Sequence, residues 1–169
     1  ARSPDYRFAE EAAKLGALTV LLWSDAAVRT ATGADPKFPQ EEREYLVQAM
    51  RYVTQVVIVD DVRPDALPQV DGLTPSIWAV KQPDMTDAKR RFGDASGITI
   101  ETIPTELLNS FPEIVEAAET ATDNKKVVVT GCYDWFHSGH VAFFEEVSSL
   151  GDLYVVVGHD ANILLLKGE

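Results

Sequence analysis

Apolar and polar positions follow one another along the chain in a pattern typical of alternating helices and strands. Apolar side chains at helical spacing predict a helix over 6–15, and the continuous apolar run over 18–23 predicts a buried strand. The same reasoning predicts helices over 39–52, 87–92 and 141–150, and strands over 56–59, 77–80, 98–103, 127–130 and 153–158. This order predicts an α/β fold: a Rossmann-like parallel sheet with flanking helices.

A direct repeat with a period of 135 residues runs through the chain. When Phe8–Gly33 is written over Phe143–Gly168 without gaps, 10 of 26 positions are identical, whereas random composition gives about two. We therefore expect two related domains. Residues 1–122 would form a first domain that lacks its opening strand, and residues 123–169 would begin a second domain with a strand, a helix and a strand. Between them, 113–124 predicts a short helix and then a linker.

The strand over 127–130 leads into Gly-Cys-Tyr-Asp-Trp-Phe-His-Ser-Gly-His at 131–140. Loops at the carboxyl ends of parallel strands are where α/β sheets bind ligands, and a helix N-terminus can receive a phosphate group. Gly131 and Gly139 allow a close approach of the backbone. His137 and His140 are three residues apart, so both project from one face of the helix and can donate hydrogen bonds to phosphate oxygens. The pattern indicates a nucleotide site.

This segment resembles the His-x-Gly-His signature of the nucleotidyltransferase superfamily. The form Gly-x-Tyr-Asp-x-Phe-His-x-Gly-His is similar to cytidylyltransferases of the glycerol-3-phosphate and ethanolamine-phosphate type, and the latter are tandem proteins. The resemblance implies transfer of CMP from CTP, with Mg²⁺, to a phospho-alcohol, giving a CDP-alcohol and pyrophosphate. It implies catalytic roles for His137 and His140. The nucleotide-binding residues implied in this copy are Thr130, Gly131, Cys132, Tyr133, Asp134, Phe136, Gly139 and Lys167.

The first copy shares part of this resemblance. Pro36–Arg43 and the later Arg51-Tyr52-Val53 resemble the downstream helix and turn of the family, and Lys37 and Arg43 are candidates for phosphate contact. Thr54 stands where the family has aspartate, and Arg2-Ser3-Pro4-Asp5 stands where the second copy has His-Ser-Gly-His. These departures leave open a catalytically inactive nucleotide-binding or dimerisation module. Because the motif does not separate cytosine from adenine, an adenylyltransferase of the same superfamily also stays open.

The composition and net charge of the chain disfavour some classes of binding partner. The 169 residues carry 15 Lys and Arg against 27 Asp and Glu, a net charge of −12, which disfavours nucleic acid as a partner. One cysteine excludes an internal disulfide and a cysteine-based zinc site, and no metal ligands are predicted. No apolar run is long enough for a membrane span, so we expect a cytoplasmic protein. The expected partners are a nucleoside triphosphate and a small phosphorylated substrate.

The missing opening strand of the first copy raises a question of assembly. In this fold that strand is central, and its absence would leave a slot between its two neighbours. We expect Lys126–Thr130 to fill the slot, either within one chain or by exchange between two chains in a homodimer.

Overall fold

The computed structural model describes residues 3–112 and 122–167. The chain divides into two compact units, Ala1–Ile114 and Val115–Glu169. The short helix expected to begin at Glu113 lies outside the described residues. Within the part that is described, no helix is long and apolar enough to cross a membrane.

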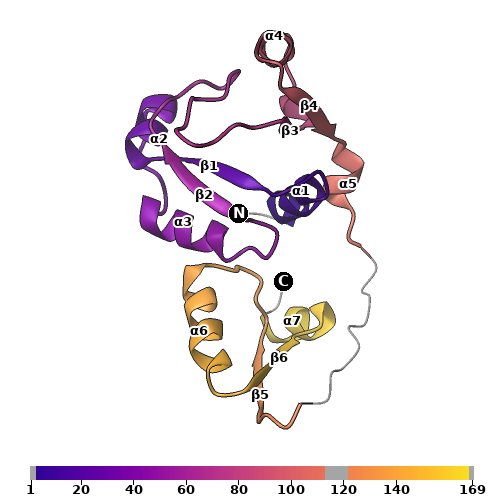
Figure 1. The fold of residues 1–169 in the computed structure, drawn as a ribbon. Helices are drawn as coiled ribbons and strands as arrows, with labels where there is room; N and C mark the ends of the chain where they lie inside the picture. The colour runs from indigo at the N-terminus through magenta and orange to yellow at the C-terminus, as the bar shows by residue number, and fades with distance from the viewer. Residues whose placement is uncertain (1–2, 113–121, 168–169) are drawn as a thin grey trace. The chain divides into compact units, whose positions relative to one another are not determined.

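The first unit contains two parallel strand pairs (Figure 1). Within each pair, helices connect the first strand to the second along the chain. β1 pairs with β2, with Val20 opposite Val56, and β3 pairs with β4, with Trp78 opposite Ile100. In chain order the elements are α1 (Ser3–Ala13), β1 (Thr19–Trp23), α2 (Asp25–Thr32), α3 (Gln40–Gln48), β2 (Gln55–Val59), β3 (Ile77–Lys81), a 3-10 turn (Gln82–Asp84), α4 (Asp87–Ser96), β4 (Thr99–Ile103) and α5 (Thr105–Asn109).

The second unit contains one parallel strand pair. β5 (Lys126–Gly131) leads through a loop into α6 (Ser138–Ser148), and then come β6 (Asp152–Val157) and α7 (Asp160–Lys167). β5 pairs with β6, with Val129 opposite Val155. Parallel strand pairs flanked by helices in both units confirm the α/β, Rossmann-like prediction. Because β5 pairs with β6, this single chain does not show the expected insertion of Lys126–Thr130 into the first copy.

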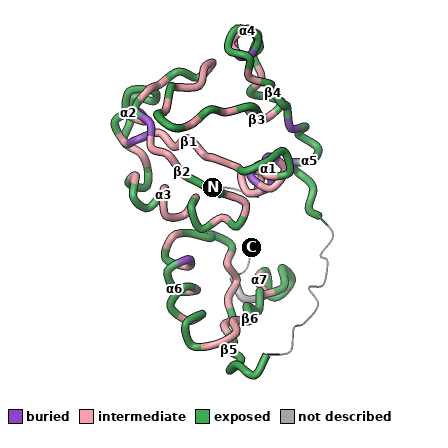
Figure 2. Tube along the Cα trace, viewed as in Figure 1, coloured by how far each residue is buried: buried purple, intermediate pink, exposed green. Residues whose placement is uncertain are grey.

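The hydrophobic core of the first unit gathers around α1, β4 and α5. Ala12, Ile103 and Leu108 are buried there, and Phe8, Leu18 and Ala79 pack against them. By contrast, Val141 is the one buried residue among those described in the second unit, and most of its trace is exposed or intermediate (Figure 2). The first unit therefore has most of the buried apolar packing that stabilises a fold.

The 135-residue repeat of the sequence is also found in the bounds of the helices. Adding 135 to the bounds of α1 gives those of α6, and adding 135 to those of α2 gives those of α7. Gly16 and Gly151, which follow α1 and α6, have nearly equal φ angles of 152° and 155°. A positive φ of this size is open mainly to glycine. The two copies therefore share the bounds of these helices and the conformation of the glycine that follows the first helix of each copy.

Three helices, α2, α5 and α7, were not predicted from the sequence, and one was predicted too long. α2 was missed although the Ser24 hydroxyl accepts a hydrogen bond from the Ala27 N–H and Gly33 ends the helix in a left-handed conformation; α7, its counterpart under the repeat, was missed too. The helix expected over 39–52 ends at Gln48, because successive turns close at Met50 and Val53 before β2 begins.

Candidate functional site

The loop after β5 has an unusual backbone. Tyr133 has a φ of 54°, and among the described residues it is the one non-glycine residue with a positive φ. Its ring lies over Gly131: a Cβ at position 131 would be 2.8 Å from the Tyr133 Cζ atom. Glycine is thus required at the end of β5, and a conformation that is costly for tyrosine is held by the surrounding contacts. Strain of this kind is concentrated at ligand-binding sites.

His137 caps the N-terminus of α6. Its Nδ1 accepts a hydrogen bond from the Gly139 N–H at 3.1 Å, so the neutral ring carries its proton on Nε2. A Cβ at position 139 would lie 3.0 Å from this ring. Gly139 therefore gives the imidazole room to fold back on the helix and leaves a donor nitrogen directed away from the cap.

The two imidazoles of the motif lie side by side. The ring centroids of His137 and His140 are 4.0 Å apart. His140 is stacked on Phe136 at 5.5 Å and meets the Tyr133 ring edge-on at 5.3 Å. Its Nδ1 atom is buried and has no hydrogen-bond partner in the protein. Buried polar atoms are nearly always paired, so an unpartnered one needs an explanation, and a ligand group supplies one.

The other residues expected at this site take different positions. Cys132 is a free, half-buried thiol next to the Gly158 backbone. Thr130 lies opposite Val156 in the strand pair and is exposed, as is Asp134. Lys167 is the last residue of α7, and its side chain is outside the described part of the structure.

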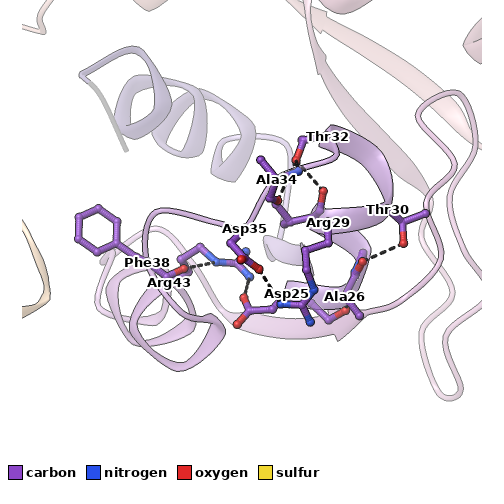
Figure 3. Close-up of polar contacts among 12 residues, drawn as sticks. Asp25, Ala26, Arg29, Thr30, Thr32, Ala34, Asp35, Phe38 and Arg43 are labelled. Atoms are coloured by element: carbon purple, nitrogen blue, oxygen red, sulfur yellow. Dashed lines mark hydrogen bonds and ion pairs between the residues drawn. The ribbon is translucent and has the colours of Figure 1, made fainter.

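The two candidates from the first copy lie in the first unit, and each nitrogen of the Arg43 guanidinium donates a hydrogen bond within the protein (Figure 3). Its guanidinium donates hydrogen bonds to the carbonyl of Trp23 at 2.8 Å, to the carbonyl of Phe38 at 3.1 Å and to Asp25 Oδ1 at 2.6 Å. Arg43 thus fastens α3 to the carboxyl end of β1. Its hydrogen bond also holds the pKa of Asp25 below the ordinary value. Lys37 is exposed, with its Nζ 5.7 Å from the Phe38 ring centre.

Sequence reasoning missed four polar residues at the motif position and strand ends of the first unit. The Ser24 hydroxyl donates a hydrogen bond to Asp60 Oδ1 at 2.5 Å, and Lys81 Nζ lies 2.5 Å from Asp5 Oδ1. Asp5 occupies the place 135 residues before His140. The repeat alignment already contained this signal, but the lysine partner, 76 residues further along the chain, was visible only in the fold.

Part of the chain is similar in sequence to bacterial proteins. The chain is 44% identical over 61 residues to the bifunctional protein HldE of Alkalilimnicola ehrlichii, covering 34% of this chain and 13% of that protein. It is 44% identical over 54 residues to HldE of Geobacter sulfurreducens, with 31% and 11% covered. HldE of Helicobacter pylori is 32% identical over 75 residues, with 42% and 16% covered. No family model matches the chain.

The fold and these similarities support a nucleotidyltransferase-like relationship. The matches are local: the chain spans only 11% to 16% of the length of these relatives.

Proposed function

We propose that the second unit carries a nucleotidyltransferase site built on the Gly131–His140 loop. The observation that supports this most directly is the pair of adjacent imidazoles at the start of α6, one of them with a buried nitrogen that has no partner in the protein. The strained Tyr133 backbone and the close packing on Gly131 add to it, because both belong to the same loop.

The proposed reaction transfers a nucleoside monophosphate to a phosphorylated alcohol. An oxygen of the acceptor phosphate forms a bond to the α-phosphorus, and the bond from that phosphorus to the bridging oxygen breaks, releasing pyrophosphate. Negative charge develops on the phosphate oxygens during this step. His137, through its Nε2–H, and His140 would donate hydrogen bonds to that charge, and no covalent intermediate with the protein is needed. CTP is the proposed nucleotide, and ATP is the alternative.

Magnesium enters this proposal with the substrate. No group of three or more His, Cys, Asp and Glu side chains that could hold a metal ion occurs in the described ranges. The described side chains therefore do not form a site in which the protein alone supplies the ligands of a magnesium ion. Mg²⁺ binds readily to substrate phosphates, so we propose that it arrives on the triphosphate.

For the first unit, a binding or structural role is the better proposal. Where the second copy has His140, the first has Asp5, an anion that would repel a triphosphate and that is held by Lys81. This unit would not carry out the chemistry itself.

The test is turnover of CTP and of ATP with Mg²⁺ and phosphorylated alcohols or sugars, followed by pyrophosphate release. We expect His140→Ala to lower kcat by about 10²-fold or more, because it removes a donor to the transition state. Unmodified chain that binds neither nucleotide in a calorimetric titration would overturn the proposal.

Two variants separate chemistry from helix capping. His137→Asn keeps a side chain that can cap α6 but loses the imidazole donor, so turnover should fall while the fold is kept. His159→Asn is the matched control, because the His159 Nδ1 caps α7 by accepting from the Ala161 N–H at 3.1 Å, outside the motif. Equal losses in the two variants would indicate a structural role for His137.

A further inference from the structure

The imidazole ring of His140 is oriented by packing rather than by a hydrogen bond. Its Nδ1 atom is buried and has no hydrogen-bond partner in the described part of the chain. The hydrogen bond made by one ring nitrogen usually decides how a functional histidine presents the other. Here aromatic rings surround the imidazole instead: Phe136 is stacked on it at an interplanar angle of 14°, and Tyr133 meets it at 76°.

Both of these aromatic rings contact a third ring, that of Phe144. The Phe144 ring centroid lies 5.3 Å from that of Tyr133 and 5.9 Å from that of Phe136. Phe144 follows His140 by four residues in α6, so the two side chains lie on the same face of the helix, one turn apart. Phe144 is half-buried, and its effect reaches His140 through the two rings that it contacts.

Phe144 also contacts the strained part of the loop. Tyr133 has a φ of 54° with its ring over Gly131, and such a conformation persists only where surrounding contacts hold it. The edge-to-face contact with Phe144, at an interplanar angle of 60°, is one of those contacts, and aromatic pairs of this geometry attract each other. A change at Phe144 is therefore transmitted to a residue that flanks His140.

The internal repeat links the ring at position 144 to the histidine. Subtracting 135 from 140 and 144 gives Asp5 and Ala9, so the first copy lacks both the imidazole and the phenyl ring. Phe143, the neighbouring residue, is retained in the first copy as Phe8. The ring at 144 therefore occurs together with the histidine, whereas the ring at 143 occurs with and without it.

We propose that Phe144 is a positioning residue for the transfer reaction. It holds the rings of Tyr133 and Phe136 in place, and these in turn fix the direction in which His140 donates its hydrogen bond. The inference rests on the proposed function, in which that hydrogen bond stabilises charge on the phosphate oxygens. Direction matters in such a step, because a small misplacement of a donor lowers the rate of the reaction even when substrate still binds.

Steady-state kinetics of the full chain tests this role. Phe144→Leu keeps an apolar side chain but removes the ring, so we expect kcat to fall about tenfold while KM for the nucleotide changes less than about twofold. Phe144→Tyr keeps the ring and should retain the kcat of the unmodified chain. Phe143→Leu is the matched control, because Phe143 is the adjacent phenylalanine of the same helix and is 44% exposed; it should leave kcat unchanged.

Nuclear magnetic resonance of the three histidine rings gives a readout that does not depend on turnover. Ring currents shift the signals of protons held beside aromatic rings, so the Cε1–H signal of His140 should move in Phe144→Leu and stay in the other two variants. The His159 signal, from outside the motif, should stay in all three and thus reports that the unit remains folded. Phe144→Met fills the space with a flexible apolar chain and is measured alongside, so that the test does not depend on one variant.

Three results would overturn the inference: an unchanged kcat in Phe144→Leu, an equal loss of kcat in Phe143→Leu, or a His140 signal that does not move. Failure of the proposed function has a different signature, because the unmodified chain would then show no turnover with either nucleotide, and the inference would fall with it.

Discussion

At the scale of single residues, charged side chains of the first unit form hydrogen bonds and ion pairs that join different helices and strands. Arg43 was a candidate for phosphate binding from its place in the sequence. In the structure its guanidinium donates hydrogen bonds to two carbonyl groups and to the Asp25 carboxylate. A sequence gives the identity of an arginine but not the carbonyl groups that the fold brings to it. The Asp5–Lys81 pair makes the same point, because it joins residues from α1 and β3.

The Asp25–Arg43 pair gives a pH-dependent prediction. The pKa of Asp25 is lowered, chiefly by the Arg43 hydrogen bond, so its stabilisation is fully present above the ordinary value of 3.8 and is lost as pH falls through the lowered pKa. Asp25→Asn should therefore lower the free energy of unfolding at neutral pH, and the difference from the unmodified protein should shrink in acid.

Urea unfolding at a series of pH values measures this difference. Asp94→Asn, at an exposed position of α4, is the control and should show little change. A difference for Asp25→Asn that is constant down to acid pH would contradict the assignment.

At the scale of elements, capping and glycine positions decide the bounds of helices. α4 begins where Thr86 caps it by accepting from the Lys89 N–H and ends where Gly97 takes a φ of 71°. Inside this helix, Gly93 is buried against β4 and the turn before it: an added Cβ would lie 2.9 Å from Ile100 Cδ1 and 2.9 Å from the Ile98 carbonyl oxygen. The glycine is there for close packing.

Gly93→Ala should destabilise the protein, although alanine is the better helix former. The collision with Ile100 and with the Ile98 backbone should lower the free energy of unfolding by about 1–3 kcal/mol. Asp94→Ala, one position on and exposed, should change it by less than about 0.5 kcal/mol. Chemical denaturation of the two variants measures both values, and a stabilised Gly93→Ala would contradict the packing described here.

The alternation of apolar runs was enough to predict the strands and most helices, because a buried parallel strand needs a continuous apolar stretch. It did not predict α2, which has only eight residues. The sequence feature that could have indicated this helix is the capping residue Ser24. In the motif loop, the spacing of His137 and His140 indicated a shared face. The positive φ of Tyr133 and the buried Nδ1 of His140 depend on packing and required the structure.

At the scale of the whole molecule, burial is uneven between the units. The first unit buries Ala12, Ile103 and Leu108 together, whereas Val141 is the only buried side chain in the described part of the second. Regions with little buried apolar surface open locally at low free-energy cost. The Val-rich edge of β5 and β6, with Val156 and Val157 more than half exposed, is a surface that association would cover.

Hydrogen exchange should report this difference. In dilute protein, the amides of β5 should exchange much faster than those of β4 and α1, because local opening of the second unit breaks few contacts. Measuring exchange by mass spectrometry tests this expectation, and exchange in β5 as slow as in β4 and α1 would contradict it.

The matching bounds of α1 with α6 and of α2 with α7 have a consequence for how the chain folds. β1 and β6 are equivalent in the repeat, so during refolding each can approach β2, although β1 is its neighbour in the structure. Chains in which β6 arrives first must release it before the final pairing forms. Refolding should therefore show a slow phase that depends on errors between repeated segments, a hazard that tandem sequences share.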